Sequence, residues 1–178
     1  MLSSIIKYSK IFIFTFIITF LTLISSNHIV NALTPRISED QIHATHYVIS
    51  SSVKYGKKSF KLQYTKKGST NWTTSIKNGM KQWNAEGTSI SLGDSTYKIE
   101  SKAYGTASWA GDTTKYTIFL NDSAVKNDTQ RSEVVAHELG HTLGLGHVSC
   151  QSELMRSTGL KGSASLYAGD IAGYHKIW

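Results

Sequence analysis

The chain has 178 residues, of which 40% are hydrophobic and 17% are charged, and its formal net charge is +7. That length suits one ordinary domain, with or without a processed segment, and argues against two full domains. The single cysteine excludes an intramolecular disulfide framework and any cysteine-built zinc finger or iron–sulfur site. The moderate charge and the 11% aromatic content argue against general disorder.

The N-terminal segment has the basic, apolar and then polar order of a secretory signal peptide. Lys7 and Lys10 precede the apolar-rich run 11–24, and Val30-Asn31-Ala32 offers small residues before a cut. A run of fourteen residues is short for a membrane span, which needs about 20. We therefore expect residues 1–32 to be removed after Ala32 and the protein to be secreted. The alternative is an uncleaved membrane anchor through residues 11–24.

Removal of this segment leaves 146 residues and a net charge of +5, because the segment holds two lysines and no acid. Cys150 is then a free thiol or the partner of a cysteine in another chain. Most of the remaining positive charge lies between residues 47 and 85, which hold no acid and eight lysines: Lys54, Lys57, Lys58, Lys61, Lys66, Lys67, Lys77 and Lys81. This stretch is either a solvated face or a patch attracted to an anionic cell envelope or acidic proteins.

The first half of the mature chain predicts two strands and a helix behind an extended lead-in of residues 33–46. Short strands are expected at residues 47–50 and 60–64. Apolar side chains then recur at helical spacing, which predicts a helix with one buried stripe: Trp72, Ile76, Met80 and Trp83. Thr70 or Asn71 is expected to cap its start, and Gly87 to end it.

The second half predicts two more strands and a second helix. β-branched and aromatic residues are frequent at 97–104 and 116–121, and the segment 105–111 joins these strands. The helix is expected at about residues 129–143, with Asn127 or Asp128 as its cap. Strands and helices in this order predict an α/β or α+β domain over residues 47–178.

The second helix contains the sequence His137-Glu-Leu-Gly-His141. Two histidines four positions apart lie on one helix face, so both imidazoles can reach one metal ion. Glu138 then places a carboxylate close to a water bound to that metal. This motif alone is moderately specific for a metal site. The alternative is a set of histidines that holds no metal.

The motif continues with Gly144 and His147, seven and ten residues after His137. Glycine freely takes positive φ, so Gly144 allows the backbone to turn sharply at the helix end. That turn lets His147 supply a third nitrogen. Three protein ligands and one open position are typical of catalytic zinc, whereas structural zinc has four protein ligands.

Met155 stands eight residues after His147, and HExxHxxGxxH followed by a methionine turn is the mark of the metzincin metalloproteases. The chain resembles their matrixin branch, the matrix-metalloprotease-like peptidases, and in particular its small secreted microbial members. The resemblance rests on residues 143–147, on the short interval to Met155 and on the closing segment 166–178. It implies an α+β, metzincin-like zincin fold, with a twisted mixed sheet, a helix beneath it, the HExxH helix, and a small C-terminal subdomain ending in a helix.

The resemblance also implies an activity, a zinc-dependent metalloendopeptidase that hydrolyses peptide bonds in protein or peptide substrates. His137, His141 and His147 would bind one catalytic zinc ion, and Glu138 would be the general base for a zinc-bound water. Met155 would pack beneath the zinc site in the turn. Residues 107–110 would form the edge strand that pairs with extended substrate, and residues 156–165 would wall the pocket for the residue after the scissile bond.

Some features of the family are missing from the sequence. No histidine lies between Tyr47 and Ala136, so the second, structural zinc of vertebrate matrixins has no ligands here. No cysteine precedes the motif, which argues against latency by a cysteine switch. Ser157 stands where astacins and serralysins have a tyrosine. Calcium is compatible with the sequence but is not predicted, because the acids form no recognisable cluster.

Two other functions are compatible with the sequence. One is a secreted zinc-binding surface or adhesin-like domain that does not cleave; the intact Glu138 argues against it. The other is a basic module that binds an anionic surface through the lysines of residues 54–81. No motif indicates nucleic-acid binding, and we expect a monomer.

Overall fold

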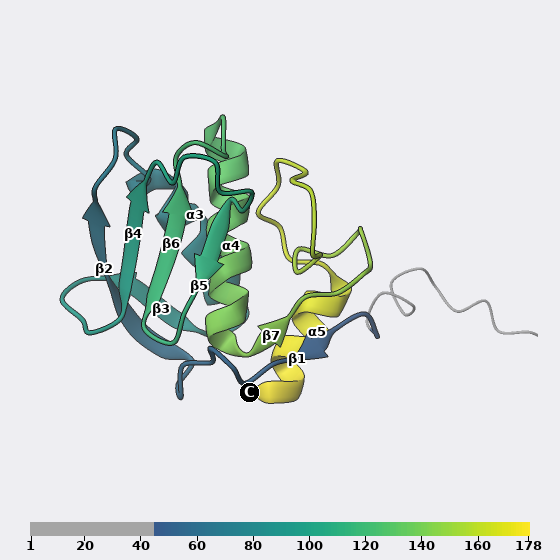
Figure 1. The fold of residues 1–178 in the computed structure, drawn as a ribbon. Helices are drawn as coiled ribbons and strands as arrows, with labels where there is room; N and C mark the ends of the chain where they lie inside the picture. The colour runs from purple at the N-terminus through teal and green to yellow at the C-terminus, as the bar shows by residue number, and fades with distance from the viewer. Residues whose placement is uncertain (1–44) are drawn as a thin grey trace, which may run out of the picture. The chain divides into compact units, whose positions relative to one another are not determined.

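The structure is a computed structural model that describes residues 45–178 (Figure 1). The described residues all belong to the unit Glu39–Trp178. The predicted signal peptide (1–32), the alternative anchor (11–24) and all but the end of the lead-in (33–46) lie outside the described residues, so they stay predictions. Among residues 45–178, no helix has the length and apolar character needed to cross a bilayer.

A five-stranded mixed sheet forms one layer of the domain, with the strand order β3-β2-β4-β6-β5 (Figure 1). Its four parallel strands are β2 (Ser59–Lys66), β3 (Ser89–Leu92), β4 (Lys98–Lys102) and β6 (Thr117–Asn121). The edge strand β5 (Gly111–Thr113) runs antiparallel to β6. In β2, buried Phe60 and Leu62 alternate with exposed neighbours, so one face of the sheet is covered.

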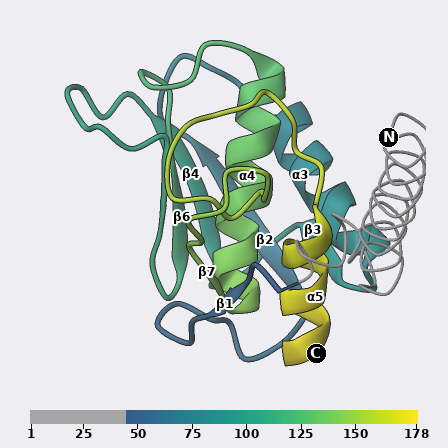
Figure 2. The same cartoon turned by 90° about the vertical axis from the view of Figure 1, so that its right-hand side faces the viewer.

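Two helices cover that face, α3 (Thr73–Ala85) and α4 (Asp128–Leu143), and Figure 2 shows them on the same side of the sheet. The predicted stripe of α3 is buried, since Ile76 and Trp83 have no exposed surface. The helices approach closely at Gly79, where a Cβ atom would lie 2.7 Å from Val135 Cγ1. Trp83 Nε1 donates a hydrogen bond to the carbonyl of Ala136 (2.7 Å) and fixes this contact.

The ends of α4 follow from local sequence. Asn127 Oδ1 accepts a hydrogen bond from Gln130 N (2.9 Å), so Asn127 is the N-cap. Gly144 is the C-cap and has φ 104°, a left-handed conformation that disfavours any other residue. At α3 the N-cap is Trp72, without a side-chain cap hydrogen bond, so the predicted cap at Thr70 or Asn71 is wrong. Asn71 Oδ1 accepts from Thr73 N (2.9 Å) just before the helix, and Gly87 (φ 90°) follows the helix end, as predicted.

The chain after α4 forms a small subdomain. Strand β7 (Leu145–Gly146) pairs antiparallel with β1 (Val48–Ile49), apart from the main sheet. The last helix, α5 (Ala168–Ile177), ends one residue before the C-terminus (Figure 1). A mixed sheet, helices on one face and a C-terminal subdomain that ends in a helix confirm the predicted α+β fold.

The predicted edge strand at residues 107–110 is wrong, because the strand begins at Gly111. Residues 103–110 instead form a loop that contains a turn at Gly105 (φ 61°). The side chain of Asn121 is buried and donates to the carbonyl of Trp109 (3.0 Å), while Asn121 N donates to that of Ala110 (2.9 Å). The backbone hydrogen bonds of β6 thus extend to Ala110, and the side chain of Asn121 holds the loop that precedes it.

Candidate metal centre

Helix α4 and the chain that leaves it bring three imidazoles together. His137 and His141 lie one turn apart on α4, and the left-handed Gly144 turns the chain so that His147 returns to them. His147 Nε2 lies 3.1 Å from Nε2 of His137 and 3.2 Å from Nε2 of His141. Two nitrogens bound to a tetrahedral zinc ion at 2.0–2.1 Å are about 3.3 Å apart. The three histidines therefore have the spacing of zinc ligands.

Backbone carbonyls fix the orientation of two of these rings. His137 Nδ1 donates to Leu154 O (2.8 Å), and His141 Nδ1 donates to Leu145 O (2.8 Å). With the proton on Nδ1, the Nε2 atom of each ring presents a lone pair to the centre. Burial, and next the neighbouring histidines, lower the pKa of His137 to about 3, and burial also lowers the pKa of His141. Neutral rings with converging lone pairs fit a cation.

Glu138 lies beside these histidines and is buried. Its Oε2 accepts a hydrogen bond from the hydroxyl of Thr113 on β5 (2.6 Å). Gly111 makes room for this carboxylate, since a Cβ atom there would lie 2.6 Å from Glu138 Oε1. Burial raises the pKa of Glu138 to about 8, against the lowering effect of the Thr113 hydrogen bond. A cation held by the histidines would stabilise the ionised form and lower that pKa.

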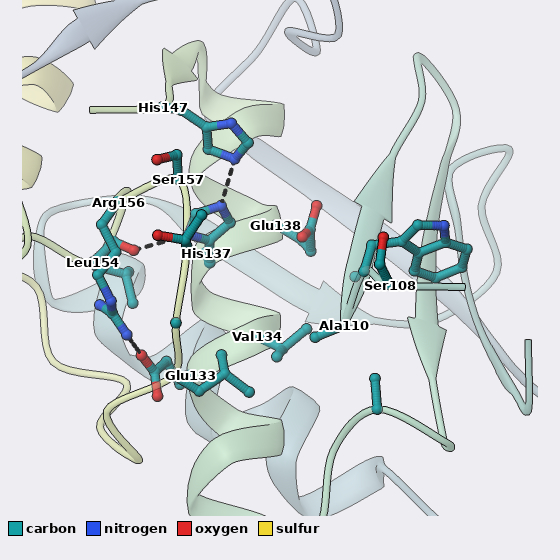
Figure 3. A pocket seen from close by; sticks show the side chains of 16 residues that line it. Ser108, Ala110, Glu133, Val134, His137, Glu138, His147, Leu154, Arg156 and Ser157 are labelled. Atoms are coloured by element: carbon teal, nitrogen blue, oxygen red, sulfur yellow. Dashed lines mark hydrogen bonds and ion pairs between the residues drawn. The ribbon is translucent and has the colours of Figure 1, made fainter. Parts of the chain in front are cut away.

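A cavity of about 410 Å³ opens next to the histidines. Figure 3 shows Glu138 between the histidines and the chain that carries Ser108 and Ala110. Residues 156–160 line another side of the cavity, which is where the predicted wall of residues 156–165 begins. The cavity therefore combines a candidate metal ligand set, a buried carboxyl group and a loop wall.

Met155 is buried under α4. A Cβ atom on Gly140 would collide with Met155 Sδ, so the helix and the methionine turn pack without a gap. Asp170 at the start of α5 holds this turn, because its carboxylate accepts from Leu154 N (2.8 Å) and Met155 N (3.0 Å). Met155 thus contributes packing, and Leu154 orients a ring of the histidine cluster.

The sequence did not predict the roles of Thr113 and Asp170, nor the buried ion pair between Glu133 and Arg156. The carboxylate of Glu133 also accepts from three backbone amides: Lys161 N (3.0 Å), Gly162 N (2.6 Å) and Ser163 N (3.3 Å). Figure 3 shows this pair beside the cavity, on the side away from His147. One signal was available: Glu133 lies four positions before His137, so it shares the face of α4 that carries the histidines.

A protein-family model described as Matrixin matches residues 27–178. The chain belongs to the matrixin family. This confirms the predicted matrixin branch of the metzincins, and at family level the protein is a zinc metalloprotease whose substrates are peptides. The three clustered histidines are a metal-ligand set that suits the zinc of a matrixin.

Other comparisons add little to this assignment. No curated protein matches this matrixin. Among solved structures, the one titled "GM1 bound form of the ECX AB5 holotoxin" has 12% sequence identity and a TM-score of 0.43, and the match covers 80% of this chain and 83% of that one.

Proposed function

We propose that this matrixin is a secreted metalloendopeptidase in which His137, His141 and His147 hold one zinc ion and Glu138 is the general base. One observation carries the proposal. The Nε2 atoms of the three histidines converge beside a buried carboxyl group on the wall of a cavity of about 410 Å³. Pocket, ligands and base occur together in the arrangement that peptide hydrolysis needs.

The bound zinc, Glu138 and the groups that orient them each have a separate role in the reaction. When bound, zinc supplies a Lewis acid that activates water and stabilises the negative charge that develops on the peptide carbonyl oxygen. The Glu138 carboxylate takes a proton from the water that attacks the peptide carbonyl and delivers it to the leaving amine. The Thr113 hydroxyl, 2.6 Å from Oε2, orients that carboxylate. Leu154 O and Leu145 O keep two histidine rings turned toward the centre.

Substrate binding follows from the edge of the sheet and the cavity. Strand β5 is the last strand of the sheet, so its outer edge offers backbone groups to an extended peptide. The residue after the scissile bond enters the cavity along residues 156–160. Strand pairing supplies affinity that depends little on sequence, and the cavity supplies side-chain preference.

A non-catalytic zinc-binding surface domain is the alternative. Such a domain requires the histidines but has no use for a carboxyl group buried next to them. Glu138 therefore supports a catalytic function. Its carboxyl group is buried, lines the cavity and fits there because Gly111 has no side chain.

Secretion, a monomeric state and attraction to an anionic envelope belong to the same proposal and rest on the sequence. Seven of the eight lysines of residues 54–81 are exposed, whereas Lys54 is half-buried with its Nζ 4.2 Å from the centre of the Trp178 ring. Exposed lysines are expected on a solvated face and also on an electrostatic patch. Retention of the protein on anionic vesicles, measured at low and at high salt, distinguishes the two.

The experiment that tests the function is incubation of the mature protein with a denatured protein and a peptide library. The expected result is cleavage at internal peptide bonds that a zinc chelator abolishes and added zinc restores. Zinc-loaded, folded protein that leaves every peptide intact would establish the binding-domain alternative. The cut sites also report which side chain the cavity accepts.

A further inference from the structure

A second cluster of metal-binding side chains lies in the C-terminal subdomain, and it includes the only cysteine of the chain. His46, Cys150 and Glu153 each offer one ligand atom, and these atoms all lie within 4.8 Å of one another. None of the three belongs to the histidine centre described above. Imidazole, thiolate and carboxylate are the three ligand types that zinc binds in proteins.

The carboxylate of this cluster is held in place by the start of α5. Glu153 has no exposed surface, and its Oε2 accepts from Gly169 N (3.0 Å) and Asp170 N (3.3 Å). These two backbone amides at the start of the helix hold Glu153 Oε2 in place. Glu153 therefore presents a carboxylate of fixed orientation.

The thiol is brought next to this carboxylate by a tight turn. Glu153 N donates to Cys150 O (3.4 Å), which closes the turn between the two residues. Cys150 Sγ lies 2.9 Å from Ser152 Oγ. A hydroxyl in that position can donate to a thiolate, the form of cysteine that binds metals.

His46 joins the cluster from the start of the described residues, just before strand β1. Strand β1 follows directly, has two residues and pairs with β7 alone. Its side chains bury little, since Val48 and Ile49 are 46% and 51% exposed. A metal ion shared by His46 and the turn at 150–153 would fasten this start of the domain, where a chain with one cysteine has no disulfide to do so.

We propose that His46, Cys150 and Glu153 form a second site for a zinc-like divalent metal ion. The ion ties the first residues of the domain to the turn that carries Met155. Three protein ligands leave a fourth coordination position for solvent. The site is separate from the proposed catalytic one and does not depend on it.

The test uses the purified full chain, freed of metal with a chelator under nitrogen and titrated with Co²⁺. Cobalt bound by a thiolate absorbs in the near ultraviolet, and Cys150 is the only thiol, so this absorption reports on Cys150 alone. We expect two bound equivalents and a near-ultraviolet band that saturates with one of them. His46→Ala and Glu153→Gln should each weaken the binding that gives this band at least tenfold.

Two controls separate this site from the catalytic centre. Cys150→Ser should remove the band and one equivalent of metal while peptide hydrolysis persists. His147→Ala should abolish hydrolysis and leave the band. Failure of hydrolysis in the wild type, with the band present, would overturn the proposed function and not the second site.

A measurement on the wild type covers the case in which a variant does not fold. Cys150 should react with a disulfide reagent at least tenfold more slowly in metal-loaded protein than after chelation. The proposal is overturned if saturating Co²⁺ gives no near-ultraviolet band, or if the band is unchanged in both His46→Ala and Glu153→Gln.

Discussion

Helix α4 buries two glutamates five positions apart, Glu133 and Glu138, and their surroundings differ. Glu133 accepts from the Arg156 guanidinium and from three backbone amides of the loop at 161–163. Glu138 accepts from one hydroxyl, that of Thr113, and lies beside the histidines. Burial is common to both, so burial alone does not mark a catalytic carboxyl group. The difference is that Glu133 is fully engaged in holding a loop, whereas Glu138 remains available for a proton.

The largest effect is expected on catalysis, when the carboxylate of Glu138 that carries the proton is replaced. Glu138→Gln keeps the size and the hydrogen bond to Thr113 but removes the base. We expect kcat/KM to fall about 1,000-fold, within the range that general acid–base catalysis contributes. Zinc content and the free energy of unfolding should stay within experimental error of the wild type. Activity within tenfold of the wild type, with zinc bound, would show that another group carries the proton.

The next largest effect is expected at Glu133, on stability and not on the chemical step. Glu133→Gln leaves Arg156 buried without its counter-ion, which typically costs about 3 kcal/mol. Urea unfolding of the zinc-loaded protein measures this loss. The control is the double variant Glu133→Met with Arg156→Met, which removes both charges and should recover part of the stability. If both variants are as stable as the wild type, the pair does not hold the loop.

The smallest effect is expected at the hydroxyl that orients Glu138. Thr113→Val preserves the shape of the side chain and removes the donor at 2.6 Å. We expect kcat to fall about tenfold, which corresponds to about 1.4 kcal/mol, with stability changed by less than about 1 kcal/mol. The matched control is Thr117→Val, on the neighbouring strand β6. An unchanged kcat in Thr113→Val would mean that burial alone positions Glu138.

The sequence predicted α4 and its histidines well because both depend on short-range geometry. Helical spacing places His137 and His141 on one face, and the Gly144 turn needs only local backbone freedom. Asn127 was recognised as a candidate cap for the same reason, since its hydrogen bond spans three residues.

The contacts that distinguish the two glutamates were missed because they join distant parts of the chain. Arg156 is 23 residues from Glu133, and Thr113 is 25 residues from Glu138. No periodicity in a single chain shows such pairs. The edge strand that the resemblance implied at residues 107–110 was also wrong, because a buried side chain, Asn121, holds those residues as a loop through the carbonyl of Trp109. The residue types at 107–110 do not indicate that hydrogen bond.

Locating the bound metal decides whether His137, His141 and His147 hold zinc beside Glu138. The measurement is an anomalous-difference map at the zinc edge from crystals of the zinc-loaded protein. We expect a peak about 2.0–2.1 Å from Nε2 of each of the three histidines. Zinc-loaded crystals with no peak between these rings, or with zinc bound by other residues alone, would contradict it.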